Sequence, residues 1–450
     1  MRLAYSPFSK MKKLLIITSS GGGGLIQAAN AKEQEIHLKY PNITIIRRDV
    51  LKDWVWKWMG FFSIKLWNTA QKKGNVRALK FLCINLVASD FLFAPHVFFK
   101  TLYTLLKEDI DHVIDTQPLC TASIVKALRL FHWFTGKKIY LEKVLVDFPT
   151  RKATHYFRSI RNLSKIDRSY IKVTTIAPFL ENGESSQEFW QKNCRLPEEQ
   201  VNYEPFYVRQ SFCKYHKKPR LQEPLRITVK IKNSEELFLI KQSVQRGCLE
   251  VHWTEKEAEF VIGTRDRVFT ILLGSQPAHE GTLNYVRKFL TMAQEYDTLK
   301  VPSHLFIFCA NHRPHGDSLL KKVSELVVQT NPYPKFFSVV PLSFQDDEVI
   351  APIFHRSDST CTRSGGHTLM ELICVAPKQI WIHSEAKKSK GLTQKDLLAG
   401  IVGWESANAV YMQDIYGAKI VTPDSFSIHA KEIFLQTADE APELSNLSLC

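Results

Sequence analysis

Short apolar runs and helix-forming segments follow one another along most of the chain. In the first half, apolar runs that predict strands lie at residues 14–18, 43–46, 112–114, 139–146 and 173–177. Segments 26–39 and 122–130 predict helices between some of these runs. Strands that alternate with helices predict a mostly parallel sheet covered by helices. We therefore expect an α/β domain at the start of the chain.

The same alternation returns in the second half. Runs at 268–273, 305–309, 337–340 and 380–383 predict strands, with helices from about residues 282 and 318. Residues 225–262 differ, because Ile227, Val229 and Ile231 alternate with polar residues, and we interpret them as a β-rich insertion or lead-in. A basic stretch with two prolines, residues 212–224, marks the boundary. The expected domains are residues 1–215 and 263–430, followed by a weakly ordered tail at 438–450.

Composition and charge narrow the class of protein. A chain of 450 residues is too long for one ordinary core, so two domains are expected. Its 44% hydrophobic and 23% charged residues exclude a collagen-like, coiled-coil or mostly disordered chain. The net charge of +15 suits an anionic partner, such as nucleic acid, an acidic membrane or a phosphorylated substrate. Because no nucleic-acid-binding signature is present, we expect no nucleic-acid partner.

Cysteine usage and hydropathy bear on the compartment. The nine cysteines are scattered and form no CxxC pair, which favours a reducing compartment without a structural zinc site. The acidic pairs at 109–111 and 346–347 are typical of a surface, so no metal is expected. The apolar run at 14–17 is too short for a signal peptide. The stretch 81–99 is interrupted by Asn85, Asp90 and Pro95, so no transmembrane helix is expected.

The strongest candidate for a ligand site is the segment 362–372. Gly365 and Gly366 open a helix here, so backbone N–H groups and the helix dipole can receive a phosphate. Glu371 follows His367 by one helical turn and can accept hydrogen bonds from both hydroxyls of a ribose. The same pattern also fits an ordinary glycine-rich turn with Glu371 on a solvated face.

Two further glycine-containing loops follow predicted strands, at 20–24 and at 273–276. Open α/β sheets bind ligands at the carboxyl ends of their strands. Taken singly, the loop at 273–276 fits a plain strand-to-helix turn better than a ligand site, and the loop at 20–24 fits either and lacks the GxGxxG fingerprint.

Together these segments resemble the two-domain GT-B glycosyltransferases. The sequence is most similar to the branch that holds the peptidoglycan lipid-linked N-acetylglucosaminyltransferase, the monogalactosyldiacylglycerol synthases and the diacylglycerol glucosyltransferases. Residues 362–372 resemble its nucleotide-sugar motif, 273–276 its second-domain loop, and 403–409 its hexose-contacting motif. Residues 196–212 and 48–52 resemble the end of its first domain and its acceptor-side segment, and the similarity spans roughly residues 12–425.

The resemblance implies an α/β fold in which two Rossmann-like domains face each other across a cleft. It implies an acceptor-side domain at 1–215 and a donor-binding domain at 263–430. A hexose or N-acetylhexosamine would pass from a nucleotide sugar, expected to be UDP-linked, to a hydroxyl of a lipid-linked acceptor, with inversion and without a metal or other cofactor. The implied donor-binding residues are Gly274, Ser275, Gln276, Arg363, Ser364, Gly365, Gly366, His367, Thr368, Glu371, Trp404, Glu405 and Asn408.

The catalytic base of this branch is missing. The family's usual histidines fall on Leu25 and Gln117, and the Gln of its hexose motif falls on Trp404. Neither Leu25 nor Gln117 can take a proton from a hydroxyl at neutral pH. The expected acceptor-side residues are therefore Gly22, Gly23, Gly24, Leu25 and Gln117, without a base among them.

Asp147 is the candidate to replace the base, since it matches an Asp-Phe pair that lipid-transferring members carry after a strand. It also fits a loop aspartate with local backbone hydrogen bonds, and Asp115 is a weaker candidate. Two alternatives stay open: a catalytically divergent nucleotide-sugar-binding protein, and a bacterial effector glycosyltransferase that acts on a host target.

The segment 54–67 is rich in tryptophan, phenylalanine and lysine. Taken as a helix, it places Trp54, Trp58 and Phe62 on one stripe, which is typical of an interfacial helix on an anionic membrane. The alternative is a core helix. The membrane interpretation predicts a cytoplasmic protein on the inner face of the membrane, with secretion as an effector left open.

Overall fold

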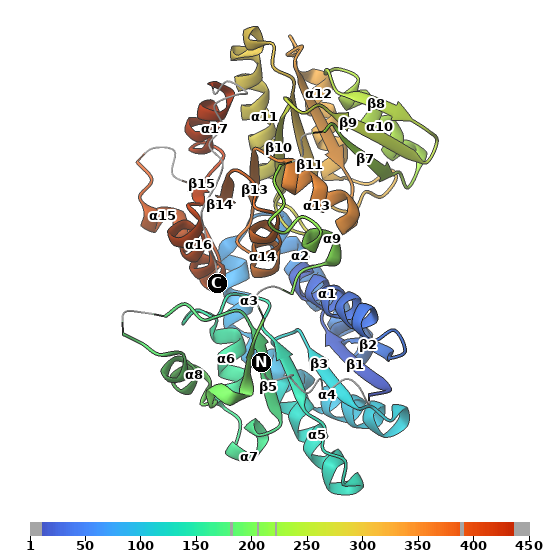
Figure 1. Ribbon diagram of the computed structural model, residues 1–450, viewed down its shortest axis with the longest axis vertical. Helices are drawn as coiled ribbons and strands as arrows, with labels where there is room; N and C mark the ends of the chain where they lie inside the picture. The colour runs from blue at the N-terminus through green and yellow to red at the C-terminus, as the bar shows by residue number, and fades with distance from the viewer. Residues whose placement is uncertain (1–10, 181–182, 205–206, 221–222, 388–390, 436–450) are drawn as a thin grey trace.

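Two parallel sheets of six strands each form the centres of two domains (Figure 1). The computed structural model describes residues 11–180, 183–204, 207–220, 223–387 and 391–435. The predicted tail at 438–450 lies outside the described residues. In Figure 1 the N-terminal domain lies below the C-terminal domain, and α1, α9 and α14 lie where the two meet.

The first sheet has the strand order β2-β1-β3-β4-β5-β6. Its strands are β1 (Lys13–Thr18), β2 (Thr44–Asp49), β3 (His112–Asp115), β4 (Leu141–Val144), β5 (Ile171–Thr175) and β6 (Val201–Tyr203). The helices of this domain are α1 (Gly23–Lys39), the π-helix η2 (Val50–Trp54), α2 (Lys57–Lys72), α3 (Val76–Ile84), α4 (Leu86–Glu108), α5 (Thr121–Thr135), α6 (Thr154–Arg161), α7 (Lys165–Arg168), α8 (Ser186–Cys194) and the 3₁₀ turn η3 (Glu198–Gln200). The strand order changes direction beside β1, which places the β1–α1 loop at the switch point where such sheets bind ligands.

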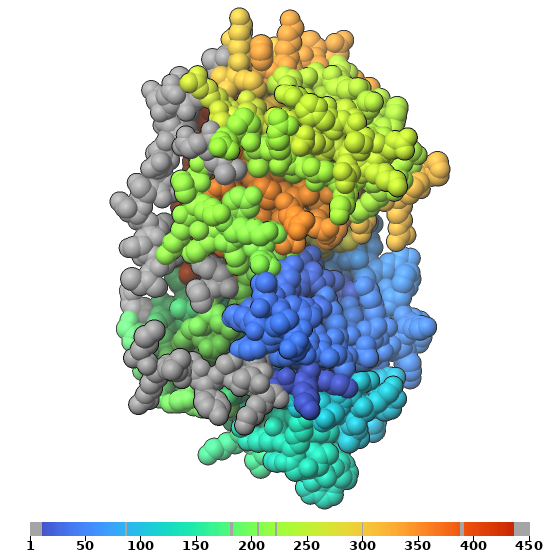
Figure 2. All heavy atoms as spheres, turned by 45° about the vertical axis from the view of Figure 1, so that its right-hand side comes forward, coloured from blue at the N-terminus to red at the C-terminus, as the bar shows by residue number. Residues whose placement is uncertain are grey.

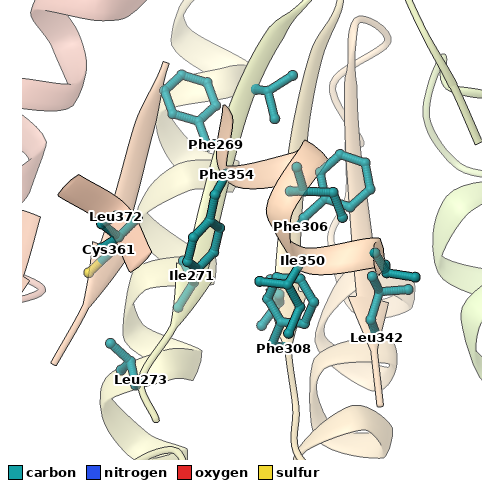
Figure 3. Packing of buried hydrophobic residues seen from close by; sticks show 14 of the residues in the cluster. Phe269, Ile271, Leu273, Phe306, Phe308, Leu342, Ile350, Phe354, Cys361 and Leu372 are labelled. Atoms are coloured by element: carbon teal, nitrogen blue, oxygen red, sulfur yellow. The ribbon is translucent and has the colours of Figure 1, made fainter. Parts of the chain in front are cut away.

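The second sheet has the order β12-β11-β10-β13-β14-β15, so two strands lie on one side of its first strand β10, whereas one strand lies on that side of β1 in the first sheet. Its strands are β10 (Arg267–Leu272), β11 (Ser303–Phe308), β12 (Phe337–Leu342), β13 (Ser359–Thr362), β14 (Ile380–His383) and β15 (Lys419–Val421). Its helices are α11 (His279–Glu295), the 3₁₀ turn η4 (Asp297–Leu299), α12 (Leu319–Gln329), α13 (Asp347–Arg356), α14 (Gly366–Val375), α15 (Gln394–Ala399), α16 (Gly403–Tyr416) and α17 (Phe426–Leu435). Figure 3 shows Phe354 of α13 packed over the buried faces of β10 and β11, so α13 closes one side of this core.

Residues 225–262 form a small antiparallel sheet in the order β7-β9-β8, with β7 (Leu225–Lys230), α10 (Ser234–Val244), β8 (Glu250–Trp253) and β9 (Glu257–Ile262). Every second residue of β7 is buried, as the alternating pattern predicts for a sheet with one covered face. The Oγ of Ser324 in α12 donates a hydrogen bond to the carbonyl of Leu239 in α10. This segment therefore packs on the C-terminal domain.

The structure also contains elements that the hydrophobic pattern did not predict. The strand β13 reads Ser-Thr-Cys-Thr and is buried at every position, because it lies between two other strands rather than at an edge. The stretch around residues 81–99 is two helices, α3 and α4. Within the described residues, no single helix has the length and apolar character to cross a membrane, although α3 and α4 together pass that test with a bend of 56°.

The segment between the domains packs onto the C-terminal one. It carries the short helix α9 (Gln210–Cys213), which lies against α13 and α14. Figure 2 shows the blue atoms of the α1 region directly below the green and orange atoms of this segment and the C-terminal domain. The N-terminal helix α1 is in contact with both α9 and α14, so the two domains touch beside the loops that carry the candidate site.

Candidate active site between the domains

A cavity of about 460 Å³ lies between the two domains. Its walls come from the loops that follow β1, β4, β10 and β13, together with α2 and the start of α16. These loops all lie at the carboxyl ends of parallel strands, where open α/β sheets place their ligands. The cavity therefore joins segments from residue 19 to residue 405 in one site.

Most of the residues predicted for a site line this cavity. They are Gly22, Gly23, Gly24, Leu25, Phe62, Asp147, Gly274, Ser275, Arg363, Gly365, Gly366, His367, Thr368, Glu371, Trp404 and Glu405. The residues predicted for a site that do not line it are Trp54, Trp58, Gln117, Gln276, Ser364 and Asn408.

The structure corrects the place of Gln117. Its side chain is fully buried, with its Nε2 donating to the carbonyl of Leu119 and its Oε1 accepting from the Leu119 N–H at 2.9 Å. Both ends of the amide are thus used to brace the turn after β3. Gln117 stabilises this loop and does not face the acceptor side of the cavity.

Asn408 also has a structural role, because its side chain links three segments by hydrogen bonds. It is buried in α16 and its Nδ2 donates to the carbonyl of Ser364 at 2.9 Å and to Asp147 Oδ1 at 3.1 Å. Instead of facing the sugar end of the cavity, Asn408 ties α16 to the β13–α14 loop and to the opposite domain.

Trp54 is a third correction. The predicted stripe assumes that one helix covers residues 54–67, but Trp54 ends the π-helix η2 and α2 begins only at Lys57. Trp54 is therefore 3% exposed in the core, whereas Trp58 is 69% exposed and Phe62 is exposed and reaches the cavity.

Glu371 lies in the wall of the cavity and is held by two basic side chains. Its Oε1 is 2.6 Å from Arg209 Nε and 3.1 Å from His367 Nε2, and its Oε2 accepts from Arg209 Nη2 at 3.0 Å. Burial raises the pKa of this carboxyl, but the charge of Arg209 and contact with His367 outweigh burial and hold the pKa at about 2. Glu371 is therefore an ionised acceptor at neutral pH.

Asp147 reaches across the boundary to the N-terminus of α14. Its Oδ1 accepts hydrogen bonds from the Gly366 N–H and from Asn408, both at 3.1 Å, and its Oδ2 lies 3.2 Å from His155 Nε2. The negative charge at a helix N-terminus is favourable because the helix dipole is positive there. Asp147 thus lies in the cavity, as predicted, and also holds the two domains together.

Glu405 lies in the first turn of α16, on the C-terminal side of the same cavity. Burial raises the pKa of this carboxyl to about 7, with Arg363 lowering it and the charge of Asp147 raising it further. Its carboxylate accepts no hydrogen bond from the described residues. It is therefore a half-buried acid whose protonation changes near neutral pH.

Three polar atoms around the start of α14 are buried without a hydrogen-bond partner in the described parts of the chain: Thr362 Oγ1, Ser364 Oγ and His367 Nδ1. Buried polar atoms without a partner are costly and normally have a ligand or water. Arg363 lies beside them, 3.5 Å from Glu385. These donors and the helix N-terminus can bind an anion such as a diphosphate. Across the described residues, no group of three or more His, Cys, Asp or Glu side chains is placed to hold a metal ion.

Two glycines allow the domains to approach each other at this point. A Cβ at Gly23 would collide with the side chain of Ser275, and a Cβ at Gly366 would collide with the backbone at Val146 and Asp147. Any larger residue would push the two walls of the cavity apart. The glycine-rich loops therefore serve the contact between the domains as well as the ligand site.

Sequence reasoning missed Arg209 and His155. Arg209 is buried between Glu371 and the ring of Phe212, 5.0 Å from the ring centre. The ring of His155 packs against Trp404 in a tilted arrangement, with 4.7 Å between the ring centres, and contacts Asp147. No local pattern marks either residue, because their partners are 162, 249 and 8 positions away in the chain.

Two Rossmann-like α/β domains that face each other across a cavity define the GT-B fold, which confirms the fold expected from the sequence. The comparisons found no matching family model and no matching curated protein. Among solved structures, MurG from Acinetobacter baumannii is similar with 13% identity and a TM-score of 0.41, over 94% of this chain and 90% of that chain.

Two further solved structures have comparable scores. The UDP-GlcNAc 2-epimerase from Neisseria meningitidis bound to UDP-GlcNAc has 13% identity and a TM-score of 0.40, over 94% of this chain and 98% of that one. The spinosyn rhamnosyltransferase SpnG complexed with thymidine diphosphate has 8% identity and a TM-score of 0.43, over 95% of this chain and 90% of that one. These are similarities of fold.

Proposed function

We propose that the chain is a glycosyltransferase that moves a hexose or N-acetylhexosamine from a UDP-sugar to a hydroxyl acceptor. The observation that carries this proposal is the start of α14, where Thr362, Arg363 and His367 line one cavity and the buried Thr362 Oγ1 and His367 Nδ1 have no hydrogen-bond partner among the described residues. That group of donors suits the diphosphate of the donor. The ionised Glu371, one turn further along α14, suits the hydroxyls of a ribose.

The chemistry expected there is a single inverting displacement. The acceptor oxygen attacks the anomeric carbon as the bond to the diphosphate breaks, and the helix N-terminus and Arg363 stabilise the charge on the leaving nucleotide. Such a step needs a base to remove the acceptor proton. Since Leu25 stands where the family has a histidine, the candidates are the two carboxyl groups in the cavity, Asp147 and Glu405.

A lipid-linked acceptor at an anionic membrane is the acceptor class that we propose. Large apolar side chains are exposed on the helices beside the cavity, and we call this set the aromatic face: Trp56, Trp58, Phe61, Phe62, Phe81, Phe91 and Phe99. Residues 56–85 carry six Lys or Arg and no Asp or Glu. Basic and aromatic side chains together favour binding to anionic lipid. Phe62 belongs both to this face and to the cavity wall, so a lipid could reach the site from the bilayer. We therefore propose that the protein acts on the cytoplasmic side of a membrane.

Ligand-induced stabilisation tests the donor site. We expect a UDP-sugar to raise the melting temperature of the chain, whereas GDP- and ADP-sugars give smaller shifts, because a ligand that binds only the folded state stabilises it. Arg363→Ala should lose the shift, and Arg265→Ala, an exposed arginine outside the cavity, should keep it. If no nucleotide sugar raises the melting temperature, the proposal is wrong.

The alternative proposal is a divergent protein that binds the nucleotide sugar without transferring it. The observation in its favour is the apolar Leu25 at the place of the family's base. An assay that detects free sugar or nucleotide released from the donor, by mass spectrometry, distinguishes the transferase from the divergent binder. An effector glycosyltransferase with a protein acceptor would show transfer to protein rather than to lipid in the same assay.

A further inference from the structure

Two carboxyl groups meet in the cavity from opposite domains, and their surroundings differ. Asp147 follows β4 in the N-terminal domain, and Glu405 begins α16 in the C-terminal domain. They are close enough for the charge of Asp147 to act on Glu405, and both act on Cys83 of α3. Two carboxyl groups of one site whose surroundings differ can take different chemical roles.

Both carboxylate oxygens of Asp147 are in contact with neighbouring polar groups. Its two oxygens take the Gly366 N–H, the Asn408 amide and a contact with His155. These donors hold the side chain in one place, and the N-terminus of α14 adds a favourable dipole. Both of its oxygens are thus already in contact with protein groups, and moving the side chain would break the contact between the domains.

Glu405 has the opposite surroundings. No ion pair within 4.0 Å and no hydrogen bond to its carboxylate occurs among the described residues. The charged and titratable groups that face it are Arg363 from the β13–α14 loop, Asp147 from the end of β4 and Cys83 from α3. His155 of α6 packs on the neighbouring Trp404. Burial dominates, and it raises the pKa of Glu405 to about 7.

We infer that Glu405 is the general base of the transfer and that Asp147 is a positioning residue. This inference rests on the proposed glycosyltransferase function. In the step, the acceptor O–H proton passes to the Glu405 carboxylate while the acceptor oxygen forms its bond to the anomeric carbon. The bond between that carbon and the diphosphate oxygen breaks, and its electron pair leaves with the nucleotide. The proton is later released to water, so no oxidant, reductant or other co-reactant is needed.

The inference also accounts for the absence of a histidine at Leu25. A base must be free, close to the reacting hydroxyl and able to change protonation near the working pH. In the cavity, Glu405 meets the first and last of these requirements from the donor-binding side. The N-terminal loop then needs only to let the acceptor approach, for which the small residues Gly22 and Gly24 suffice.

The test uses water as the acceptor, so the natural acceptor need not be known. UDP-sugar hydrolysis by the full chain is measured as kcat/KM between about pH 5 and 9, with the donor that gives the largest thermal shift. We expect the rate to rise with pH through a midpoint near 7, because Glu405 must be ionised. Glu405→Gln should lower kcat by about 100-fold or more and abolish this rise. Calorimetry should give Glu405→Gln a donor affinity within a few-fold of wild type.

Two further variants separate a base from a structural residue. Glu405→Asp should keep the pH-dependent rise at a reduced rate, because the carboxyl is retained. Asp147→Asn should move the midpoint to lower pH, because it removes a negative charge that raises the pKa of Glu405.

Each contrary outcome has one meaning. If Glu405→Gln keeps the pH-dependent rise, or if Asp147→Asn abolishes it, the assignment of the base is overturned. Wild-type chain that binds a UDP-sugar but releases no sugar at any pH also overturns it and favours the divergent binder. Wild-type chain that binds no nucleotide sugar overturns the proposed function itself.

Discussion

Arg209 and Glu371 join the segment between the domains to α14 through a two-point ion pair, with 2.6 Å between Arg209 Nε and Glu371 Oε1 and 3.0 Å between Nη2 and Oε2. Both side chains are buried. Planar, two-point pairs of this kind are among the strongest charge-assisted hydrogen bonds. The linking segment is thereby fixed to the helix that carries the proposed donor site.

Arg209→Met should destabilise the chain by about 3–5 kcal/mol at pH 7, since it leaves a buried carboxylate without its partner. The pKa of Glu371 falls from 4.5 to about 2 on folding, so the stabilising effect is present above about pH 4.5 and is lost as the pH falls towards 2. Urea unfolding measures this at pH 7 and at pH 3. The free energies of unfolding of wild type and Arg209→Met should differ more at pH 7 than at pH 3.

The control for this pair is the double variant Arg209→Met/Glu371→Gln. It removes the buried charge as well as its partner, so we expect it to be more stable than Arg209→Met alone. If the free energy of unfolding of Arg209→Met lies within about 0.5 kcal/mol of the wild-type value, the ion pair contributes little to stability.

Glu371→Ala should weaken binding of the best UDP-sugar by about 30-fold or more, because two hydrogen bonds to a charged acceptor are together worth roughly 2–4 kcal/mol. Titration calorimetry measures this directly. Arg209→Met is the comparison, because it disturbs Glu371 without removing its carboxylate. If Glu371→Ala and Arg209→Met lose the same amount of UDP-sugar affinity, Glu371 acts only by holding the linking segment.

Asp147→Ala should loosen the contact between the domains at α14. The variant removes the acceptor for the Gly366 N–H and for Asn408, which are 219 and 261 positions away in the chain. We expect faster hydrogen exchange of the peptide that contains Gly366, measured by mass spectrometry, with exchange in β10 and β11 unchanged. Asp147→Asn retains an oxygen acceptor and should show a smaller increase. Unchanged exchange in both variants would contradict the bridging role.

The aromatic face should bind anionic membranes. Replacing Trp58, Phe61 and Phe62 by serine should reduce cosedimentation with phosphatidylglycerol vesicles at least tenfold, because each large apolar side chain contributes roughly 1.5–3 kcal/mol when fully buried. The matched control replaces three exposed apolar residues of the C-terminal domain, Phe238, Ile428 and Leu435. Equal binding by the two triple variants would remove this face from the membrane contact. Trp54 is excluded from the test, since it is part of the core.

The sequence by itself determined the architecture and the approximate place of the site. Apolar runs separated by helical segments predict parallel sheets, and glycines after those runs predict ligand loops, because parallel strands present their carboxyl ends along one edge. Gly22, Gly274, Gly365 and Glu371 all line the cavity for this reason. These conclusions depend only on local spacing, which the chain displays directly.

Only the tertiary structure decided how the charged groups pair. Arg209 reaches Glu371, and Asp147 reaches Gly366, because the domains close on one another, and no local period encodes a contact between such distant positions. The same holds for β13, whose polar residues become a buried strand only between β10 and β14. The pKa of Glu405 likewise depends on burial in the assembled cavity, where Arg363 and Asp147 act on it from opposite domains.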